Sequence, residues 1–174
     1  EESRTLAAYY LPNTACFGRG ENITHYIYRQ GSGGEKLKSK RYQWDKRDEK
    51  SVLLEVRASG QTMGPGSVHP DTQEHIVWMN DEPIHDIDPD ALGMAANHLA
   101  AASLLMRDWH TGNRDELAVC LVGSMVRAGW PDDKVDGFLS PILMITGDEE
   151  STKRFKAHRL REELANDGRV PGLK

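Results

Sequence analysis

Apolar and polar positions alternate over short runs in the first half of the chain. These runs are rich in β-branched and aromatic residues and are bounded by glycine, proline or polar residues, which is the pattern of strands. They predict strands at 15–19, 24–30, 36–44, 51–58 and 74–79. The segment 31–34, Gly-Ser-Gly-Gly, predicts a turn that joins the second and third of these strands as a hairpin.

After Asp88 the apolar positions recur at helical spacing. Asp88 is the predicted N-cap and Pro89 the first helical residue, because aspartate accepts bonds from free amides and proline lacks one. Three further helices are predicted over 113–130, 131–147 and 148–168. Pro141 is expected to kink or divide the middle one. The pattern therefore predicts an α+β protein, with a strand-rich domain over 1–85 and a small all-α domain over 86–174.

The chain has 174 residues, enough for one comfortable core or two small ones. No apolar run approaches the roughly 20 residues of a membrane span, and the acidic start lacks the basic residues of a secretion signal. We therefore expect a cytoplasmic protein with no membrane partner. The two cysteines, Cys16 and Cys120, are too isolated to indicate a disulfide framework or a zinc site.

Charge is distributed unevenly along the chain. The formal net charge of -5 argues against a protein that coats DNA through phosphate contacts alone. A basic segment, 29–57, nevertheless precedes an acidic one, 70–90, which has no lysine or arginine. The candidate DNA contacts in and near the basic segment are Lys36, Lys38, Lys40, Arg41, Lys46 and Arg47.

Two pairs of charged residues lie at predicted strand ends. Arg19 and His25 could face a common edge where phosphate oxygens bind, or they could be a surface arginine and a structural histidine. Glu55 and Arg57 follow an apolar strand core on one face, where a carboxylate needs a partner. A salt bridge and a metal or nucleotide role both satisfy that need, and spacing does not choose between them.

The loop after this strand, 61–70, is rich in glycine and proline and therefore has a defined shape. It offers Gln61, Ser67 and His69 to a ligand, or it is a tight connection that binds nothing. Asp86, Asp88 and Asp90 are more typical of a helix cap and its first turn than of a metal site. A small metal-dependent hydrolase built on Asp86, Asp88 and His69 is for this reason the weakest hypothesis.

Several segments together resemble the bifunctional primase-polymerase domain of the archaeo-eukaryotic primase superfamily, found in phage and plasmid replication proteins. They are YYLPNTACFGRGENITHYIYR from Tyr9, VLLEVRASGQTMGPGSVHP from Val52, HIVWM from His75 and GNRDELAVCLVGSMVRAGW from Gly112. The resemblance implies an RRM-like catalytic piece followed by a helical bundle. It also implies nucleotidyl transfer from NTP or dNTP on a single-stranded DNA template, with Mg²⁺ or Mn²⁺, and a helicase as a downstream or separate partner.

The resemblance also assigns roles to residues. His25 matches the histidine that contacts the triphosphate, with Thr24 standing where the family usually has serine. Glu55 matches a later metal-binding acid, so His25 and Glu55 are the implied catalytic residues. The remaining residues that by resemblance belong to the nucleotide site are Arg19, Arg57, Gln61, Ser67 and His69.

The aspartate pair of the family has no match here. Two-metal transfer needs carboxylates that bridge both ions, and Glu55 alone cannot supply them. We therefore expect a fragment or degenerate relative whose parent is the enzyme, with a non-catalytic DNA-binding or protein-interaction module as the alternative. In either case His25 and Glu55 should come from adjacent strands and point into one cleft, roofed by the turn at 65–69.

Overall fold

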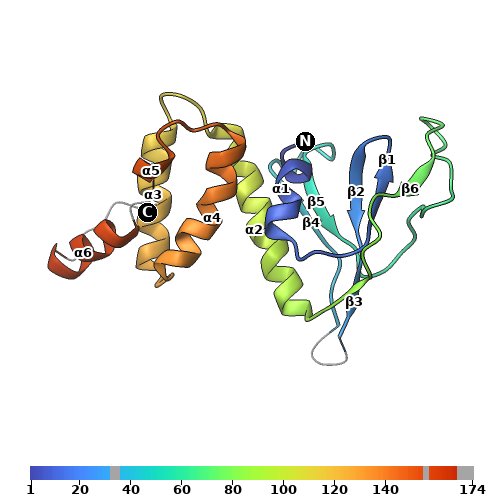
Figure 1. The fold of residues 1–174 in the computed structure, drawn as a ribbon, viewed down its shortest axis with the longest axis horizontal. Helices are drawn as coiled ribbons and strands as arrows, with labels where there is room; N and C mark the ends of the chain where they lie inside the picture. Colours follow the sequence, from blue (N-terminus) through green and yellow to red (C-terminus); the bar gives the residue numbers. More distant parts are fainter. Residues whose placement is uncertain (32–35, 155–156, 168–174) are drawn as a thin grey trace. The chain divides into compact units, whose positions relative to one another are not determined.

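The chain folds into two compact units, Glu1–Ala101 and Ala102–Lys174, in a computed structural model that describes residues 1–31, 36–154 and 157–167 (Figure 1). The first unit contains small sheets and helices and the second contains helices, so the α+β prediction is confirmed at this level. The two units divide within helix α2, Pro89–Asp108, whereas the sequence pattern placed the change after residue 85.

Within the described part of the first unit, seven strands form three small sheets. The largest is antiparallel in the order β2-β1-β6. β4 and β5 form an antiparallel pair, and β3 and β7 form a parallel pair. The strands are β1 (Cys16–Arg19), β2 (Asn22–Tyr26), β3 (Tyr28–Gln30), β4 (Lys40–Gln43), β5 (Val52–Val56), β6 (Ile76–Trp78) and β7 (His85–Ile87).

The predicted hairpin between the second and third strands is wrong. β3 pairs with β7 and β4 pairs with β5, so the segments on either side of the glycine-rich loop have different partners. Residues 32–35 of that loop lie outside the described residues. The strand β7 was not predicted, because His85–Ile87 is short, acidic and followed by a helix cap.

Helix α1 (Glu2–Tyr10) packs against β2 and β5 and buries Leu6 completely. Just after it, the buried hydroxyl of Thr14 donates to the carbonyl of Ile27 and accepts the amide of His85 at 2.9 Å. One side chain thus ties the start of β1 to the β3–β7 pair. In the view of Figure 1, β4 and β5 lie between α1 and the pair β1–β2.

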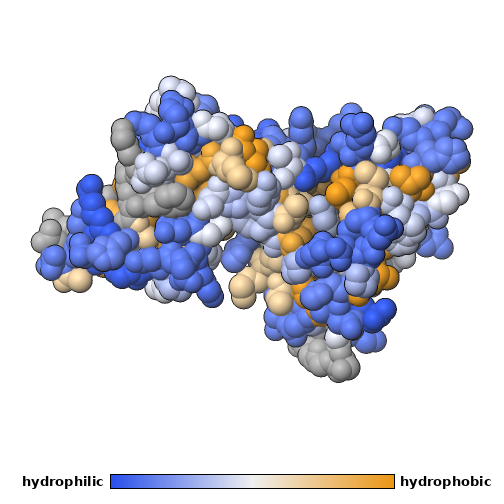
Figure 2. Space-filling view, in the orientation of Figure 1, coloured by the Kyte–Doolittle hydropathy of each residue, from blue (hydrophilic) through white to orange (hydrophobic). Residues whose placement is uncertain are grey.

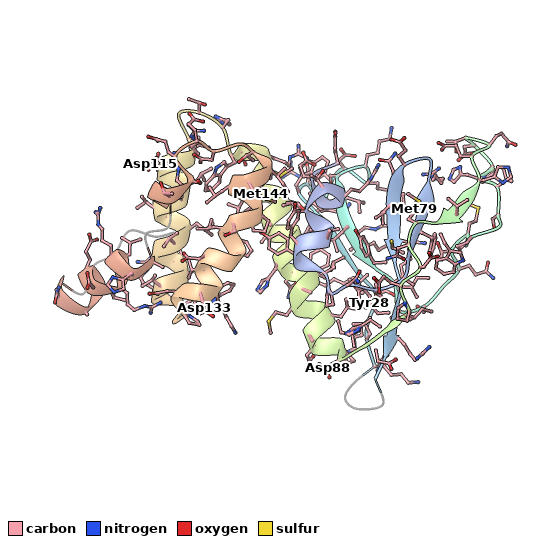
Figure 3. All side chains as sticks on the ribbon, in the orientation of Figure 1. Tyr28, Met79, Asp88, Asp115, Asp133 and Met144 are labelled. Carbon is pink, nitrogen blue, oxygen red and sulfur yellow. The ribbon has the colours of Figure 1, made fainter. Side chains whose placement is uncertain are left out.

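Helix α2 begins as predicted. Asp88 Oδ1 accepts the amides of Asp90 at 2.9 Å and Ala91 at 3.1 Å, which satisfies two free donors of the first turn. Figure 3 labels Asp88 at this end of the helix. The capping interpretation of Asp88 is therefore confirmed.

The second unit contains α3 (Arg114–Arg127), α4 (Asp132–Ile145), α5 (Ser151–Arg154) and α6 (Ala157–Asp167). Its core includes Val122, Val135, Leu139 and Ile142, all fully buried. Pro141 lies inside the single helix α4, so of the two effects expected of it, a kink or a division, the division does not occur. The last predicted helix corresponds to α5 and α6, and residues 155–156 and 168 fall outside the described part.

A buried ion cluster holds the second unit together. Arg154 is 2% exposed and donates to Asp148 at 3.2 Å and to Asp115 at 2.6 Å. The indole of Trp109 also donates to Asp148, at 3.0 Å. Burial alone would raise the pKa of Asp148, but the hydrogen bonds from Trp109 and Arg154 outweigh it and lower that pKa.

The visible surface is largely hydrophilic, with apolar residues showing in smaller patches (Figure 2). Of the helices in the described ranges, none has the length and apolar character needed to cross a bilayer.

Candidate functional site

A cleft of about 630 Å³ opens in the first unit. Its walls come from β2 and the start of β3 (Ile23 to Tyr28), from β5 and the next residue (Leu53 to Arg57), and from the facing sides of α1 and α2. Tyr28, labelled in Figure 3, is the first residue of β3 and the last residue of this segment that lines the cleft. The cleft therefore gathers segments that are far apart in the sequence.

His25 lies in this cleft with both ring nitrogens engaged. Nδ1 lies 2.9 Å from the hydroxyl of Thr24, and Nε2 lies 3.1 Å from the hydroxyl of Thr62. Phe17, its cross-strand neighbour on β1, stacks on the imidazole with ring centroids 4.4 Å apart and planes at 6°. Three neighbours thus fix the position of the ring.

The surroundings of the imidazole favour its neutral form. Burial lowers the pKa of His25 below its ordinary value, and the charges of Arg57 and Arg19 lower it further. Thr24 Oγ1 also donates to the carbonyl of Phe17 at 3.4 Å, which leaves it to accept from Nδ1–H. Nε2 is then the acceptor and Thr62 its donor.

Glu55 lies between two arginines. Its Oε2 is 3.0 Å from Arg57 Nη2, and its Oε1 is 3.7 Å from Arg41 Nη2 across the β4–β5 pair. Arg57 also donates to the backbone carbonyl of Gln61 at 3.4 Å. The salt bridge that the sequence left as one alternative is present, and Arg57 also lines the cleft.

Arg4 of α1 also lines the cleft, and sequence reasoning missed it. Its side chain is exposed and makes no ion pair with the described residues. Nothing in the local sequence marks Arg4, because its place depends on how α1 packs against β2 and β5. Thr62 was missed for the same reason, since it meets His25 only through the fold.

Other predicted residues lie outside the cleft walls. Ser67 and His69 belong to a loop that closes on itself, in which the carbonyl of Ser67 accepts the amide of Ile76 at 2.9 Å and His69 Nδ1 accepts the amides of Asp71 and Thr72. Arg19 is 3.9 Å from Glu74 of the same loop. This part of the loop has the tight self-bonded form that the sequence offered as its alternative.

The geometric expectation for His25 and Glu55 is met in part. Both line the same cleft, but β2 and β5 belong to separate sheets and do not pair with each other. Thr62, not the turn at 65–69, covers His25. Comparison of the chain with protein-family models, with curated proteins and with solved structures returns no significant match.

The candidate DNA contacts divide into two groups. Lys40 donates to Asn97 at 2.9 Å and lies over the ring of Tyr42, and Arg41 is engaged by Glu55. The remaining four have exposed side chains with no ion pair to the described residues; they are Lys36, Lys38, Lys46 and Arg47. Only this second group is free to meet a phosphate backbone without first losing a partner.

The described donors do not fit a divalent metal pair. No group of three or more histidine, cysteine, aspartate or glutamate side chains gathers in the described ranges, and both oxygens of Glu55 face guanidinium groups. Asp86 pairs with Arg29 at 3.2 Å and Asp88 caps α2. Chemically, the cleft offers two guanidinium groups, a neutral imidazole and hydroxyls, a set suited to a phosphate group.

Proposed function

We propose that the first unit binds the triphosphate of a nucleotide in this cleft, as part of a primase-polymerase that extends DNA on a single-stranded template. The observation that carries the proposal is the gathering of His25, Arg57 and Arg4 in one cleft. The resemblance of the sequence to phage and plasmid primase-polymerases supports the same reading. Replication of a mobile element is the setting that this resemblance suggests.

Each of these groups has a definite task toward a triphosphate. A guanidinium donates two parallel hydrogen bonds to phosphate oxygens, and Arg4 is unoccupied by any described carboxylate. Thr62 covers Nε2 of His25 in the structure, so its hydroxyl would move from the imidazole to a phosphate oxygen. The neutral ring would then carry its proton on Nε2, which donates to the phosphate, while Nδ1 accepts from the hydroxyl of Thr24. Glu55 holds Arg57 in place and also repels anions, which confines phosphate to the side of Arg57 away from it.

The rest of the cleft suits a flat, mostly apolar group such as a nucleobase. Ligand pockets are typically apolar, with a few polar groups that fix orientation. The apolar side chains that line this cleft include Leu11, Leu53, Leu92 and Leu99. The base would therefore lie toward α1 and α2, and the phosphates toward His25 and Arg57.

Nucleotidyl transfer in such enzymes uses Mg²⁺ or Mn²⁺ to steady the attacking and leaving oxygens. Because the described residues lack a fitting donor set, we assign them binding and orientation only. His25 and Arg57 hold and orient the triphosphate, and carboxylates beyond those described would have to complete any catalytic centre.

Titration of the full chain with ATP and dATP in the presence of a chelator tests the proposal. We expect His25→Ala and Arg57→Ala each to weaken binding about tenfold, the effect of losing one charge-assisted or buried hydrogen bond. Lys46→Ala, which removes an exposed cation outside the cleft, is the matched control and should bind like the parent. Equal binding by all four proteins would contradict the proposal.

A non-catalytic DNA-binding module is the second candidate function, and the exposed side chains of Lys36, Lys38, Lys46 and Arg47 favour it. Their contacts would be to phosphates, so binding of single-stranded DNA should weaken steeply with salt. A Lys46→Ala, Arg47→Ala double variant should lose DNA affinity and keep triphosphate affinity. DNA binding without any triphosphate binding would favour this second function over the first.

A further inference from the structure

Two strand edges, rather than two strand faces, line the cleft. A strand that shows a face to a pocket contributes every second residue, because successive side chains point to opposite sides. Here every residue from Ile23 to Tyr28 and every residue from Leu53 to Arg57 contributes. The backbones of β2 and β5 are therefore turned edge-on toward the same space.

Both edges lack a partner strand within the described ranges. β2 is the terminal strand of the order β2-β1-β6, and β5 pairs with β4 alone. Apart from the bonds of β2 to β1 and of β5 to β4, residues 23–26 and 53–56 make no backbone hydrogen bond to a described strand. An unpaired edge presents a row of amides and carbonyls that can receive another strand, and proteins ordinarily cover such edges.

The space between the edges has a backing that suits a strand. Helices α1 and α2 line it with apolar residues, namely Ala7, Leu11, Leu92, Ala96 and Leu99. β2 and β5 have five residues each, which corresponds to a length of about 17 Å at 3.3 Å per residue. A single inserted strand would thus find hydrogen-bonding partners on both sides and an apolar surface under alternate side chains.

The charges near the cleft favour an acidic occupant. Arg41 and Arg57 share one carboxylate, that of Glu55. Arg4 lines the cleft with no described carboxylate beside it. Of these residues Arg4, Arg57 and Glu55 line the cleft, which leaves one excess positive charge that an acidic side chain on the incoming strand would balance.

We propose that the cleft receives an extended strand of a partner polypeptide, in which apolar residues alternate with acidic ones. The strand pairs with the free edges of β2 and β5 and joins the sheet β2-β1-β6 to the pair β4–β5. This is strand addition on two sides at once, with main-chain hydrogen bonds supplying affinity and alternate side chains supplying specificity. It does not depend on the proposed function, although the strand and the nucleotide would use the same apolar residues of α1 and α2 and would therefore exclude each other.

Hydrogen exchange of the full chain with a heptapeptide of alternating valine and aspartate tests the inference. We expect the peptide to slow exchange of amides in both β2 and β5, because each edge gains hydrogen bonds. The same peptide N-methylated at alternate amides keeps its side chains but loses the donors that face one of the two edges, and should bind about tenfold more weakly. Protection of neither edge, or equal binding of the N-methylated peptide, would overturn the proposal.

Two substitutions test the charge argument. Arg4→Ala should weaken binding of the valine–aspartate peptide several-fold and leave folding unchanged, because the side chain is exposed. Lys46→Ala is the control and should have no effect. A valine–lysine peptide that binds as tightly as the aspartate peptide would contradict the acidic specificity.

Failure of this inference is distinguishable from failure of the proposed function. If triphosphate binding depends on His25 and Arg57 but the peptide protects neither edge, the strand proposal is rejected and the proposed nucleotide site is supported. If the peptide protects both edges but no triphosphate binds, the strand proposal is supported and the proposed nucleotide site is rejected. If both bind, the acidic strand and the triphosphate should compete for Arg4 and Arg57.

Discussion

At the scale of single residues, His25 owes its properties to its neighbours. Thr24 and Thr62 engage the two nitrogens of the imidazole, and Phe17 covers one of its faces. None of these contacts introduces a negative charge that would favour the imidazolium, and Arg57 and Arg19 disfavour it. The ring is therefore prepared to act as a neutral hydrogen-bonding group.

This environment predicts a pH dependence of stability. The folded pKa of His25 lies below its ordinary value of 6.5, so between the two values the unfolded chain binds more protons than the folded one. The contribution of His25 to the free energy of unfolding is present above pH 6.5 and is lost as the pH falls toward the folded pKa.

The measurement is chemical unfolding of the parent and of His25→Gln from neutral pH to about pH 5. Glutamine can still form hydrogen bonds but does not titrate in this range, so the variant should lose less stability on acidification. An identical loss in both proteins would show that His25 does not contribute to the pH dependence.

A second prediction at the scale of single residues concerns Glu55. Its negative charge lies beside Arg57 and Arg41 and therefore opposes the binding of an anion to them. Glu55→Gln removes one negative charge while preserving shape, so we expect triphosphate to bind several-fold more tightly in a chelator. Stability should change by less than about 1 kcal/mol, since Glu55 and its arginines are partly exposed. Weaker binding in Glu55→Gln would instead indicate that the carboxylate itself supports the nucleotide.

At the scale of elements, the β1–β2 pair depends on one close approach. The register shifts between Phe17 and Gly18, and this irregularity brings the backbone of Asn22 against Gly18. A Cβ at position 18 would lie 1.8 Å from the carbonyl oxygen of Asn22. Only glycine fits there without moving backbone, and the same strands carry Phe17 and His25.

Gly18→Ala is therefore expected to destabilise the protein by about 1–3 kcal/mol or more, as over-packed sites do. Gly64→Ala is the matched control, because a Cβ there meets nothing within 4 Å and its backbone is not in the left-handed region. Urea unfolding should separate the two variants. Equal midpoints for both would contradict the close approach at Gly18.

At the scale of the whole molecule, two units carry different kinds of stabilisation. The first contains short sheets whose outer edges have no partner strand among the described residues. The second packs helices around an apolar core and the buried Arg154–Asp148 cluster. Removing one member of a buried ion pair typically costs about 3–5 kcal/mol. Without Arg154 the buried Asp148 keeps the hydrogen bond from Trp109 and the longer ion pair with Arg114 at 3.7 Å, so we expect the lower end of that range. The structure of the second unit should therefore depend on Arg154.

We expect Arg154→Met to reduce the helical circular dichroism of the full chain and its resistance to urea. Triphosphate affinity should stay unchanged, because the residues proposed to bind it lie within Glu1–Ala101. Arg154→Lys, which keeps a charge near Asp148, should lie between the parent and Arg154→Met. Loss of triphosphate binding together with helicity would show that the two units do not fold separately.

Much of the secondary structure followed from local pattern. The cap at Asp88, the helical second half and the approximate positions of most strands depend on residues within one or two turns of each other. β7 did not follow, because a segment of three residues carries too weak a local preference and depends on its pairing with β3. The partners of β3 and β4 likewise depend on contacts distant in sequence.

Local pattern was enough to predict the α+β character and to single out His25, Glu55 and Arg57. The packing of distant segments added Arg4 and Thr62 and left Arg19, Ser67 and His69 outside the cleft walls. The physical reason is that periodicity and capping act over a few neighbouring residues. A cleft is made where α1, β2, β5 and α2 meet, and that meeting is set by non-local packing.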